Sequence, residues 1–331
     1  MQVKDIGEQG LLRILQKFCP AEIVGDDCAV MATNPNQSLA ITTDMLVDGV
    51  HFSDRTTGPY YAGWRAAAAN LSDLAAMGAT PLAVTVALAV AADTAVEWVE
   101  EFYRGMTACL QEYDTPIVGG DVVRSPVVTV AITAFGQVEC DRTISRSNAR
   151  SGWAIIATGV HGASRAGLEL LLNPEFGPNL EKVDQASLIL AHQCPKPRLD
   201  VLQIIREILD SAGEFSIAGM DSSDGLADAI IQICRASGVG AKVDRTKIPI
   251  PDIFSDILST EKALDWALYG GEDFELVLFL SITSAQLLVK KIGNGAAIVG
   301  IATENTDIWL TDSSGIYPDT VLKIDRGFQH F

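Results

Sequence analysis

The sequence predicts a mixed α and β protein of two domains, and three observations support this prediction. Helical periodicity recurs along the chain, as in the alanine-rich run 60–77, and short β-branched runs such as 82–90 lie between the helical segments. A chain of 331 residues is long enough to build two hydrophobic cores. A basic, serine-rich loop at 144–152 separates two apolar runs, so we place a boundary near residue 150. The expected domains are 1–150 and 151–331.

Local patterns predict the individual elements in chain order. One uncharged stretch, 74–92, has the length of a membrane span. Gly78 and Pro81 interrupt it, which favours a helix end, a turn and a buried strand instead, so we expect no membrane contact. We expect helices over 7–18, 60–77, 94–113, 199–211 and 223–237, and strands over 38–44, 82–90, 115–121, 127–138, 153–159, 215–221, 273–280 and 295–301.

Charge and cysteine content limit the partners and the compartment. The net charge of −18 disfavours non-specific attraction to nucleic acid or to anionic lipid, so an anionic substrate would need a local cation. The six cysteines form no C-x-x-C pair, which favours free thiols in a reducing cytosol. The charged N-terminal stretch lacks the apolar core of a signal peptide. We therefore expect a cytoplasmic protein.

Acidic residues recur directly after apolar runs, where a strand is expected to meet a loop. Carboxylates beside apolar strands need compensating cations, and hard oxygen ligands favour magnesium or calcium. The stretch 221–232 fits a calcium EF-hand poorly, because Gly225 stands at loop position 5 and Gln232 at position 12. Magnesium that bridges to phosphate fits better. The acidic residues are Asp26, Asp27, Asp44, Asp121, Asp221, Glu272 and Asp273, with Asp73 inside a predicted helix.

Each of these positions also has a structural interpretation. Aspartate is a common turn and helix-cap residue, and Asp73 could lie on a solvent-facing side of its helix. Several well-known motifs are missing from the sequence. It contains no G-x-x-x-x-G-K-[ST] loop, no G-x-G-x-x-G fingerprint and no G-x-S-x-G elbow. A P-loop, a Rossmann cofactor site and a serine hydrolase are therefore all disfavoured.

Taken in order, the motifs resemble the thiamine-monophosphate kinase family. The resemblance extends over nearly the whole chain, and it implies the PurM-like fold of aminoimidazole ribonucleotide synthetase. That fold would comprise an N-terminal α/β domain for ATP, magnesium and dimerisation, with a β-barrel that spans the dimer, and a C-terminal α+β domain. The segments that carry the resemblance are GDDCAV (25–30), TTDMLVDGVHF (42–52), NLSDLAAMGATP (70–81), VGGDVVRS (118–125), SRSNARSGWAI (145–155), HQCPKPR (192–198), MDSSDGL (220–226), YGGEDFEL (269–276) and RGFQHF (326–331).

The resemblance also implies the site residues and the ligands. ATP would be the co-substrate, thiamine monophosphate the acceptor, several Mg²⁺ ions the cofactors and a homodimer the assembly. His51 could equally be a half-buried structural histidine. The implied metal ligands are Asp27, Thr42, Thr43, Asp44, Asp73, Asp121, Asp221 and Asp224; the ATP contacts are Gly120, Asp121, Arg146 and Ser223; and the substrate contacts are His51, Glu272 and Phe328.

The expected reaction is direct in-line phosphoryl transfer assisted by magnesium. A phosphate monoester oxygen is already ionised near neutral pH, so no general base is assigned. Two alternatives remain open. The first is another ATP-using enzyme of the same fold group, and the second is a non-catalytic metal-binding or scaffold protein. ATP consumption that depends on thiamine monophosphate distinguishes the expected activity from the second alternative.

Overall fold

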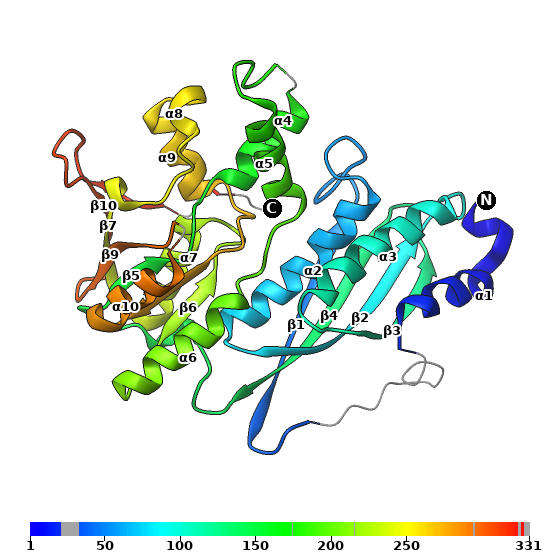
Figure 1. Ribbon diagram of the computed structural model, residues 1–331, viewed down its shortest axis with the longest axis horizontal. Helices are drawn as coiled ribbons and strands as arrows, with labels where there is room; N and C mark the ends of the chain where they lie inside the picture. The colour runs from blue at the N-terminus through cyan, green and yellow to red at the C-terminus, as the bar shows by residue number, and fades with distance from the viewer. Residues whose placement is uncertain (21–32, 174, 215, 294, 324–325, 328–331) are drawn as a thin grey trace. The chain divides into compact units, whose positions relative to one another are not determined.

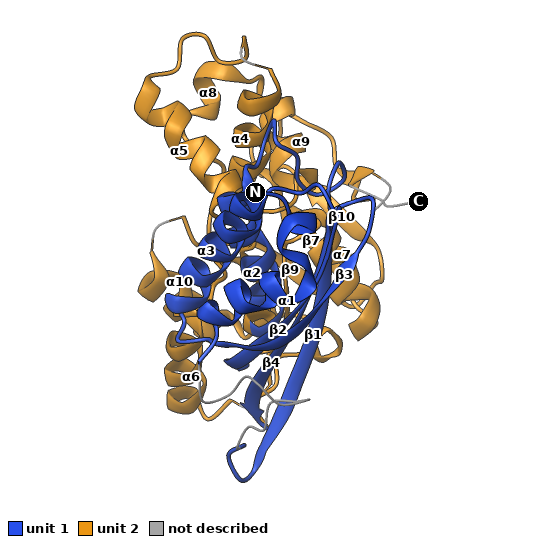
Figure 2. Ribbon diagram, turned by 90° about the vertical axis from the view of Figure 1, so that its right-hand side faces the viewer, with its two compact units in different colours: residues 1–74, 79–140 blue, residues 75–78, 141–331 orange. Residues whose placement is uncertain are grey.

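The computed structural model describes residues 1–20, 33–173, 175–214, 216–293, 295–323 and 326–327 (Figure 1). The chain divides into two compact units, of which the first comprises 1–74 and 79–140 and the second comprises 75–78 and 141–331 (Figure 2). The segment 141–150 therefore lies in the second unit. Two predicted site residues, Asp27 and Phe328, lie outside the described residues.

A four-stranded sheet forms the centre of unit 1, with the strand order β1-β4-β2-β3. All its pairs are antiparallel except β2 with β3. The helices α2 and α3 lie along one face of this sheet (Figure 1). The elements are α1 (Val3–Leu15), η1 (Gln16–Phe18), β1 (Gln37–Val47), α2 (Pro59–Ala76), β2 (Thr80–Val90), α3 (Val96–Gln111), β3 (Ile117–Arg124) and β4 (Thr129–Glu139).

Alternation along the strands explains the two faces of this sheet. On β4, every second residue from Val130 to Val138 is buried, as expected for a sheet that is covered on one side. The opposite face leaves large apolar side chains exposed, among them Ile41 at 60% and Met45 at 57%. Soluble proteins rarely leave such a row of apolar side chains uncovered, so this face is a candidate interface.

The helices α2 and α3 approach each other closely because each carries a glycine at the contact. A Cβ atom on Gly105 would come within 1.7 Å of the carbonyl oxygen of Tyr60. A Cβ atom on Gly63 would come within 1.9 Å of the carbonyl oxygen of Phe102. Neither position can carry a side chain without separating the helices, so this pair of glycines sets the distance between α2 and α3.

Unit 2 contains a seven-stranded sheet, with the strand order β11-β10-β7-β9-β5-β8-β6. Its pairs are antiparallel except β10 with β7. The elements are η2 (Arg146–Asn148), β5 (Ala154–Ala157), α4 (Ala163–Leu172), α5 (Lys182–Gln193), α6 (Asp200–Ala212), β6 (Ala218–Asp221), α7 (Leu226–Ser237), β7 (Gly240–Asp244), η3 (Arg245–Lys247), α8 (Phe254–Ile257), α9 (Thr260–Tyr269), β8 (Leu276–Leu280), α10 (Ile282–Ile292), β9 (Ala297–Thr303), β10 (Ile308–Thr311) and β11 (Thr320–Val321).

Strand β8 shows how this second sheet is buried on both faces. Its residues alternate between two hydrophobic cores: Val277 and Phe279 belong to the core that includes α7 and α9, and Leu278 belongs to the core that includes α6 and α10. A third cluster joins α4, α5, α8 and α9 around Phe254 and Trp266. These packed helices fix the loops at the ends of β5, β6 and β8, where the candidate site lies.

The predicted class is confirmed, because both units combine helices with a sheet. The described strands of unit 1 form an open sheet in the single chain and do not close a barrel by themselves. Within the described ranges, no helix combines the length and the apolar character that a membrane span requires.

Candidate active site

In unit 1, the structure brings three predicted metal ligands together where β1 meets α2. Thr42 and Asp44 are two residues apart on β1 and therefore face the same side. The Thr42 hydroxyl donates a hydrogen bond to Asp73 Oδ2. The backbone N–H of Asp44 donates to Asn70 Oδ1 at 3.2 Å, and Asn70 lies one helical turn before Asp73. Asp44 on the strand is thus joined to the helix, and Asp73 on the helix to the strand, each by one hydrogen bond.

Asn70 is fully buried and holds this arrangement in place. Its side-chain amide donates to the carbonyl oxygen of Ala66 at 3.0 Å, while its oxygen accepts from Asp44. Both functional groups of the side chain are therefore occupied, as burial requires. Asn70 belongs to the motif NLSDLAAMGATP but was not among the predicted site residues.

Thr43 and Asp121 lie away from this point within a single chain. The Thr43 side chain faces the other side of the sheet, where its hydroxyl donates to the carbonyl oxygen of Ile132 at 2.9 Å. Asp121 lies on β3, at the opposite edge of the sheet from β1, and three strand spacings separate these edges by about 14 Å. The row of paired residues that crosses the sheet runs through Asp44, Ile132, Val86 and Gly120.

Gly120, a predicted ATP contact, has a packing role of its own. A Cβ atom there would come within 2.0 Å of the Val86 carbonyl oxygen on the neighbouring strand, so only glycine fits. Because Asp121 follows Gly120 in an extended strand, its side chain belongs to the face opposite that of Asp44. Asp121 Oδ1 accepts the backbone N–H of Val122 at 2.9 Å.

His51 lies in the turn that follows β1. The ring Nδ1 of His51 accepts the backbone N–H of Val47 at 3.1 Å. The backbone N–H of His51 donates to the Val47 carbonyl at 2.9 Å. An occupied Nδ1 acceptor leaves the proton of a neutral imidazole on Nε2. The ring is partly buried, and these bonds give it a structural role alongside the predicted substrate contact.

In unit 2, the loop after β6 carries Asp221, Ser223 and Asp224. Asp221 is the last residue of β6 and is only 3% exposed, and its Oδ1 accepts the Ser223 hydroxyl at 3.0 Å. Gly225, with a φ of +107°, ends the loop and begins α7. This backbone conformation favours glycine and turns the chain directly from strand to helix.

Two other polar residues on α7 are bonded to each other. Asp228 accepts the side-chain amide of Gln232 at 2.5 Å, and the Gln232 oxygen accepts from the guanidinium of Arg146 at 2.9 Å. Arg146 is thereby held against α7. Asp228, four residues beyond Asp224, is tied to its own helix by this bond.

The loop 270–275 lies directly against the loop after β6. The backbone N–H of Glu272 donates to the Ser223 carbonyl at 2.7 Å, and the N–H of Ser222 donates to the Glu275 carbonyl at 2.8 Å. Glu272 has a φ of +60°, a conformation that costs a residue with a side chain about 1 to 2 kcal/mol. Glu272, which is predicted to contact the acceptor substrate, thus lies next to the loop that is predicted to bind nucleotide and metal.

The sequence pattern was wrong about how Glu272 is presented. We expected the motif LYGGED to follow a strand, whereas it follows helix α9, and Gly271 turns the chain toward β8 with a φ of +67°. Asp44 and Asp121 lie inside β1 and β3 rather than after them, because these strands continue for three more residues beyond each aspartate.

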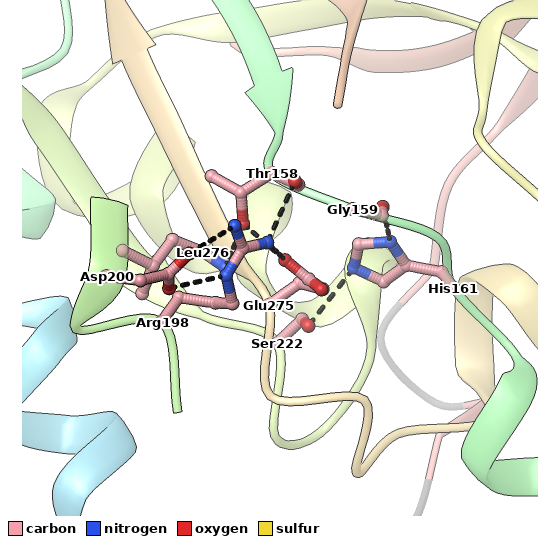
Figure 3. A network of polar contacts seen from close by, with 8 residues as sticks. All are labelled: Thr158, Gly159, His161, Arg198, Asp200, Ser222, Glu275 and Leu276. Carbon is pink, nitrogen blue, oxygen red and sulfur yellow. Dashed lines mark hydrogen bonds and ion pairs between the residues drawn. The ribbon is translucent and has the colours of Figure 1, made fainter. Parts of the chain in front are cut away.

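A network of polar contacts, most of them partly buried, is bonded to both loops (Figure 3). Arg198 forms an ion pair with Glu275, donates to the Thr158 carbonyl at 2.9 Å and binds Asp200 at 2.9 Å. The Thr158 hydroxyl donates to Glu275 at 2.5 Å and accepts the N–H of Leu276 at 2.8 Å. Burial raises the pKa of Glu275, and the charge of Arg198 opposes that shift. The network ties β5, the start of α6 and β8 together.

His161 extends the network to the loop after β6. The ring is completely buried, with Nδ1 3.0 Å from the Gly159 carbonyl and Nε2 3.1 Å from the Ser222 hydroxyl (Figure 3). A carbonyl can only accept, so the proton is on Nδ1 and the Ser222 hydroxyl donates to Nε2. Burial lowers the pKa of His161 to about 4, so the imidazole is neutral. His161 was not among the predicted site residues.

The chemistry of these donor groups suits a hard cation. The predicted ligands offer only carboxylate and hydroxyl oxygens, which magnesium prefers. The described residues contain no group of three or more His, Cys, Asp or Glu side chains already gathered around one metal position. Each unit by itself offers such oxygen ligands, unit 1 from β1 and α2, and unit 2 from the loop after β6.

Comparison with known proteins agrees with these motifs. Residues 25–138 match the family model described as AIR synthase related protein, N-terminal domain. A thiamine-monophosphate kinase of Synechococcus elongatus is 49% identical over 329 residues, which cover 99% of this chain and 98% of the relative. The thiamine-monophosphate kinase of Escherichia coli K12 is 39% identical, over 93% of this chain and 91% of the relative.

Solved structures give the same fold. The structure described as AaThiL complexed with AMPPCP and TMP is 29% identical, has a TM-score of 0.72 and matches over 97% of this chain and 98% of its own. The hydrogenase maturation protein HypE in complex with ATP is 18% identical with a TM-score of 0.76, over 98% of this chain and 97% of its own, and shares the fold alone. This chain belongs to the thiamine-monophosphate kinase family.

Proposed function

We propose that this protein transfers the γ-phosphoryl group of ATP to thiamine monophosphate and forms thiamine diphosphate. The relatives at 49% and 39% identity carry the name of this activity, and AaThiL binds AMPPCP and TMP. The observation that carries the proposal is the contact between Glu272 and Ser223 at 2.7 Å. This backbone hydrogen bond holds Glu272, whose carboxylate suits a cationic acceptor, beside the loop whose oxygen ligands suit nucleotide and metal.

The acceptor site would use charge and stacking. Thiamine carries a flat cationic ring, which Glu272 would attract by charge and which Phe328 would cover with its aromatic face. His51 would contact the same substrate. The attacking phosphate oxygen is ionised near neutral pH, so the protein would need to position it rather than deprotonate it.

The metal-binding residues would neutralise the charge of two anionic substrates. ATP carries about four negative charges and the acceptor phosphate about two, so their approach is strongly opposed. Bound Mg²⁺ ions would supply positive charge that offsets this repulsion. Gly120, Asp121, Arg146 and Ser223 would contact ATP. The residues that would hold magnesium are Asp27, Thr42, Thr43, Asp44, Asp73, Asp121, Asp221 and Asp224.

A homodimer would complete the sheet of unit 1. Leu39, Ile41 and Met45 expose apolar side chains on one face of β1, at 49%, 60% and 57%. The strands β1 and β3 form the two edges of this sheet, and exposed edges pair readily with other strands. A second copy would cover this apolar face and close the barrel. It would also bring its own β3, and with it a second Asp121, closer to Asp44.

The proposed compartment is the cytoplasm. Among the described residues, none of the five cysteines takes part in a disulfide, which agrees with a reducing environment. The net charge of −18 continues to argue against nucleic acid as a partner.

One assay tests the activity. The purified protein is incubated with ATP, Mg²⁺ and one acceptor at a time, and ADP and the phosphorylated product are quantified by chromatography. The proposal expects ADP and thiamine diphosphate in a 1:1 ratio, formed only when thiamine monophosphate is present. ADP formation with another phosphorylated acceptor would favour a different enzyme of this fold group. No acceptor-dependent turnover would favour a non-catalytic protein.

A further inference from the structure

His192 lies beside the Glu272 carboxylate, although the proposed reaction gives it no task. The imidazole, near the end of α5, is only 3% exposed. Its Nδ1 lies 3.1 Å from the Ser164 hydroxyl and 3.7 Å from Glu272 Oε2. Both contacts use the same ring nitrogen. The 3.1 Å contact has the length of a hydrogen bond, and the 3.7 Å contact is a longer polar contact, which a proton on Nδ1 would make attractive.

The next residue, Asp273, fixes the same loop from its other side. Its carboxylate accepts the backbone N–H of Gly162 at 2.7 Å and that of Ser164 at 2.9 Å, at the start of helix α4. Burial raises the pKa of Asp273 to about 7, and these two N–H bonds at the helix N-terminus oppose that shift. Ser164 therefore contacts Asp273 through its backbone and His192 through its hydroxyl. Helix α4 thus becomes the common support of both acidic residues.

The helix that carries His192 is packed tightly against α4. A Cβ atom on Gly167 would come within 2.0 Å of the Leu188 carbonyl oxygen, and within 3.0 Å of the Cβ of His192. This close approach leaves the imidazole little room to move. Glu272, in contrast, has a side chain that is 36% exposed, with three rotatable bonds of its own. The closely packed His192 ring can therefore orient the more mobile Glu272 side chain.

We infer that His192 is a positioning residue that orients the Glu272 carboxylate for the acceptor substrate through Nδ1. The inference rests on the proposed function, because it takes Glu272 as the group that attracts the thiamine cation. Asp273 binds the backbone N–H of Ser164, and the Ser164 hydroxyl binds the His192 imidazole, so the loop and the ring are both fixed to α4. The pre-oriented carboxylate loses less conformational entropy when the substrate binds, and this smaller loss strengthens acceptor binding.

Two substitutions of His192 separate this role from simple packing. The amide of asparagine reaches about as far as Nδ1, whereas the amide of glutamine reaches about as far as Nε2. Glutamine is closer to histidine in length, so a role in filling space alone would favour His192→Gln. The positioning role favours His192→Asn instead, because only that amide can replace Nδ1.

The test measures steady-state kinetics of the full chain with thiamine monophosphate and ATP. We expect His192→Gln to raise the KM for thiamine monophosphate about tenfold, and His192→Asn to raise it less than about threefold. The kcat and the KM for ATP should change by less than about twofold in both. Leu190→Gln, at a 52% exposed position on the same helix, serves as the control. Equal effects of the two His192 variants, or a larger effect of asparagine, would overturn the inference.

A double-mutant cycle separates this inference from the proposed function. In a Glu272→Gln background, His192→Gln should raise the KM no further, because the group that it positions has lost its charge. An additive increase would overturn the positioning role while Glu272 keeps its place in the site. If Glu272→Gln alone leaves the KM unchanged, the acceptor role of Glu272 fails and the inference fails with it. Should His192→Gln not fold, Ser164→Ala replaces it in the cycle, with the same expectation.

Discussion

The backbone N–H of Glu272 donates to the Ser223 carbonyl at 2.7 Å, although 49 positions separate the two residues in the sequence. This bond holds Glu272 in its left-handed conformation and fixes its distance from the loop that carries Asp221 and Asp224. A second backbone bond, from Ser222 to the Glu275 carbonyl at 2.8 Å, joins the same two loops. An acceptor bound at Glu272 would be held at a constant position relative to nucleotide bound at Ser223.

The first prediction concerns the charge of Glu272. Glu272→Gln should raise the Kd for thiamine monophosphate by about tenfold or more, because an isosteric amide no longer attracts the cationic ring. The Kd for ATP should stay within about twofold. Isothermal titration with each ligand measures both values. The control is Glu261→Gln, because Glu261 lies on α9 and pairs with Arg245 at 3.6 Å. If Glu272→Gln leaves the Kd for thiamine monophosphate unaltered, Glu272 is not part of the acceptor site.

The second prediction concerns the cation requirement. Asp44→Asn and Asp73→Asn should each raise the Mg²⁺ concentration for half-maximal turnover by about tenfold or more, since each loses a carboxylate ligand. A magnesium titration at saturating substrates measures the change. Asp93→Asn, exposed in the same unit, is the control. Normal magnesium dependence in both variants would show that these carboxylates bind no catalytic cation.

The third prediction concerns pH and His161. Its pKa is about 4 in the folded protein against an ordinary value of 6.5, because burial disfavours the charged ring. Below pH 6.5 the unfolded chain takes up a proton that the folded chain does not. The free energy of unfolding should therefore fall as the pH drops from 6.5 toward 4, by about 3 kcal/mol in all.

Urea unfolding of the wild type and of His161→Gln over this pH range isolates that contribution. The variant has no titrating group at the position, so its free energy of unfolding should fall less steeply with acidity than that of the wild type. Glutamine can still accept from the Ser222 hydroxyl, which keeps the loop in place. Parallel pH profiles for the two proteins would contradict the buried neutral state of His161.

The fourth prediction concerns the contact between α2 and α3. Gly105→Ala should lower the free energy of unfolding by about 2 to 4 kcal/mol, because the new methyl group would meet the Tyr60 carbonyl oxygen at 1.7 Å. Helix propensity alone predicts the opposite sign. Gly58→Ala, where an added Cβ meets no atom within 4 Å, is the control. Denaturant unfolding of both variants decides between the two expectations.

The fifth prediction concerns the open face of the unit 1 sheet. Ile41→Glu places a charge on a side chain that is 60% exposed and is proposed to be buried between two copies. The sedimentation coefficient of the wild type should be that of a dimer, and that of the variant should shift toward a monomer. Exposed Val183 on α5, mutated to Glu, is the control. A wild type that sediments as a monomer at micromolar concentration would contradict the dimer.

The sequence predicted the elements that have strong local patterns. The alanine-rich run 60–77 became α2 at 59–76, and the β-branched run 82–90 became most of β2 at 80–90. Elements with weak patterns escaped prediction. The strand β7, GAKVD, carries a lysine and only one β-branched residue, and α9 is a short helix whose end was mistaken for a strand end. Tertiary packing determined both.

The candidate site was predictable only in part. Asp44 and Asp73 belong to two separate motifs that were both predicted to bind metal. Hydrogen bonds between β1 and α2 bring these two motifs together. The distance of Asp121 from Asp44 follows from strand order, which local patterns do not contain. His161 and His192 escaped notice because their partners lie 61 and 80 positions away, at Ser222 and Glu272. Contacts of this range arise from packing rather than from spacing along the chain.

Direct phosphoryl transfer is tested most directly by a rapid-quench single turnover. ATP labelled on its γ-phosphorus is mixed with excess enzyme, Mg²⁺ and thiamine monophosphate, and protein, nucleotide and product are separated after acid quench. The label should pass from ATP to thiamine diphosphate in one phase, with none on the protein at any time. Label that appears on the protein before the product, or label released only as inorganic phosphate, would contradict the proposed function.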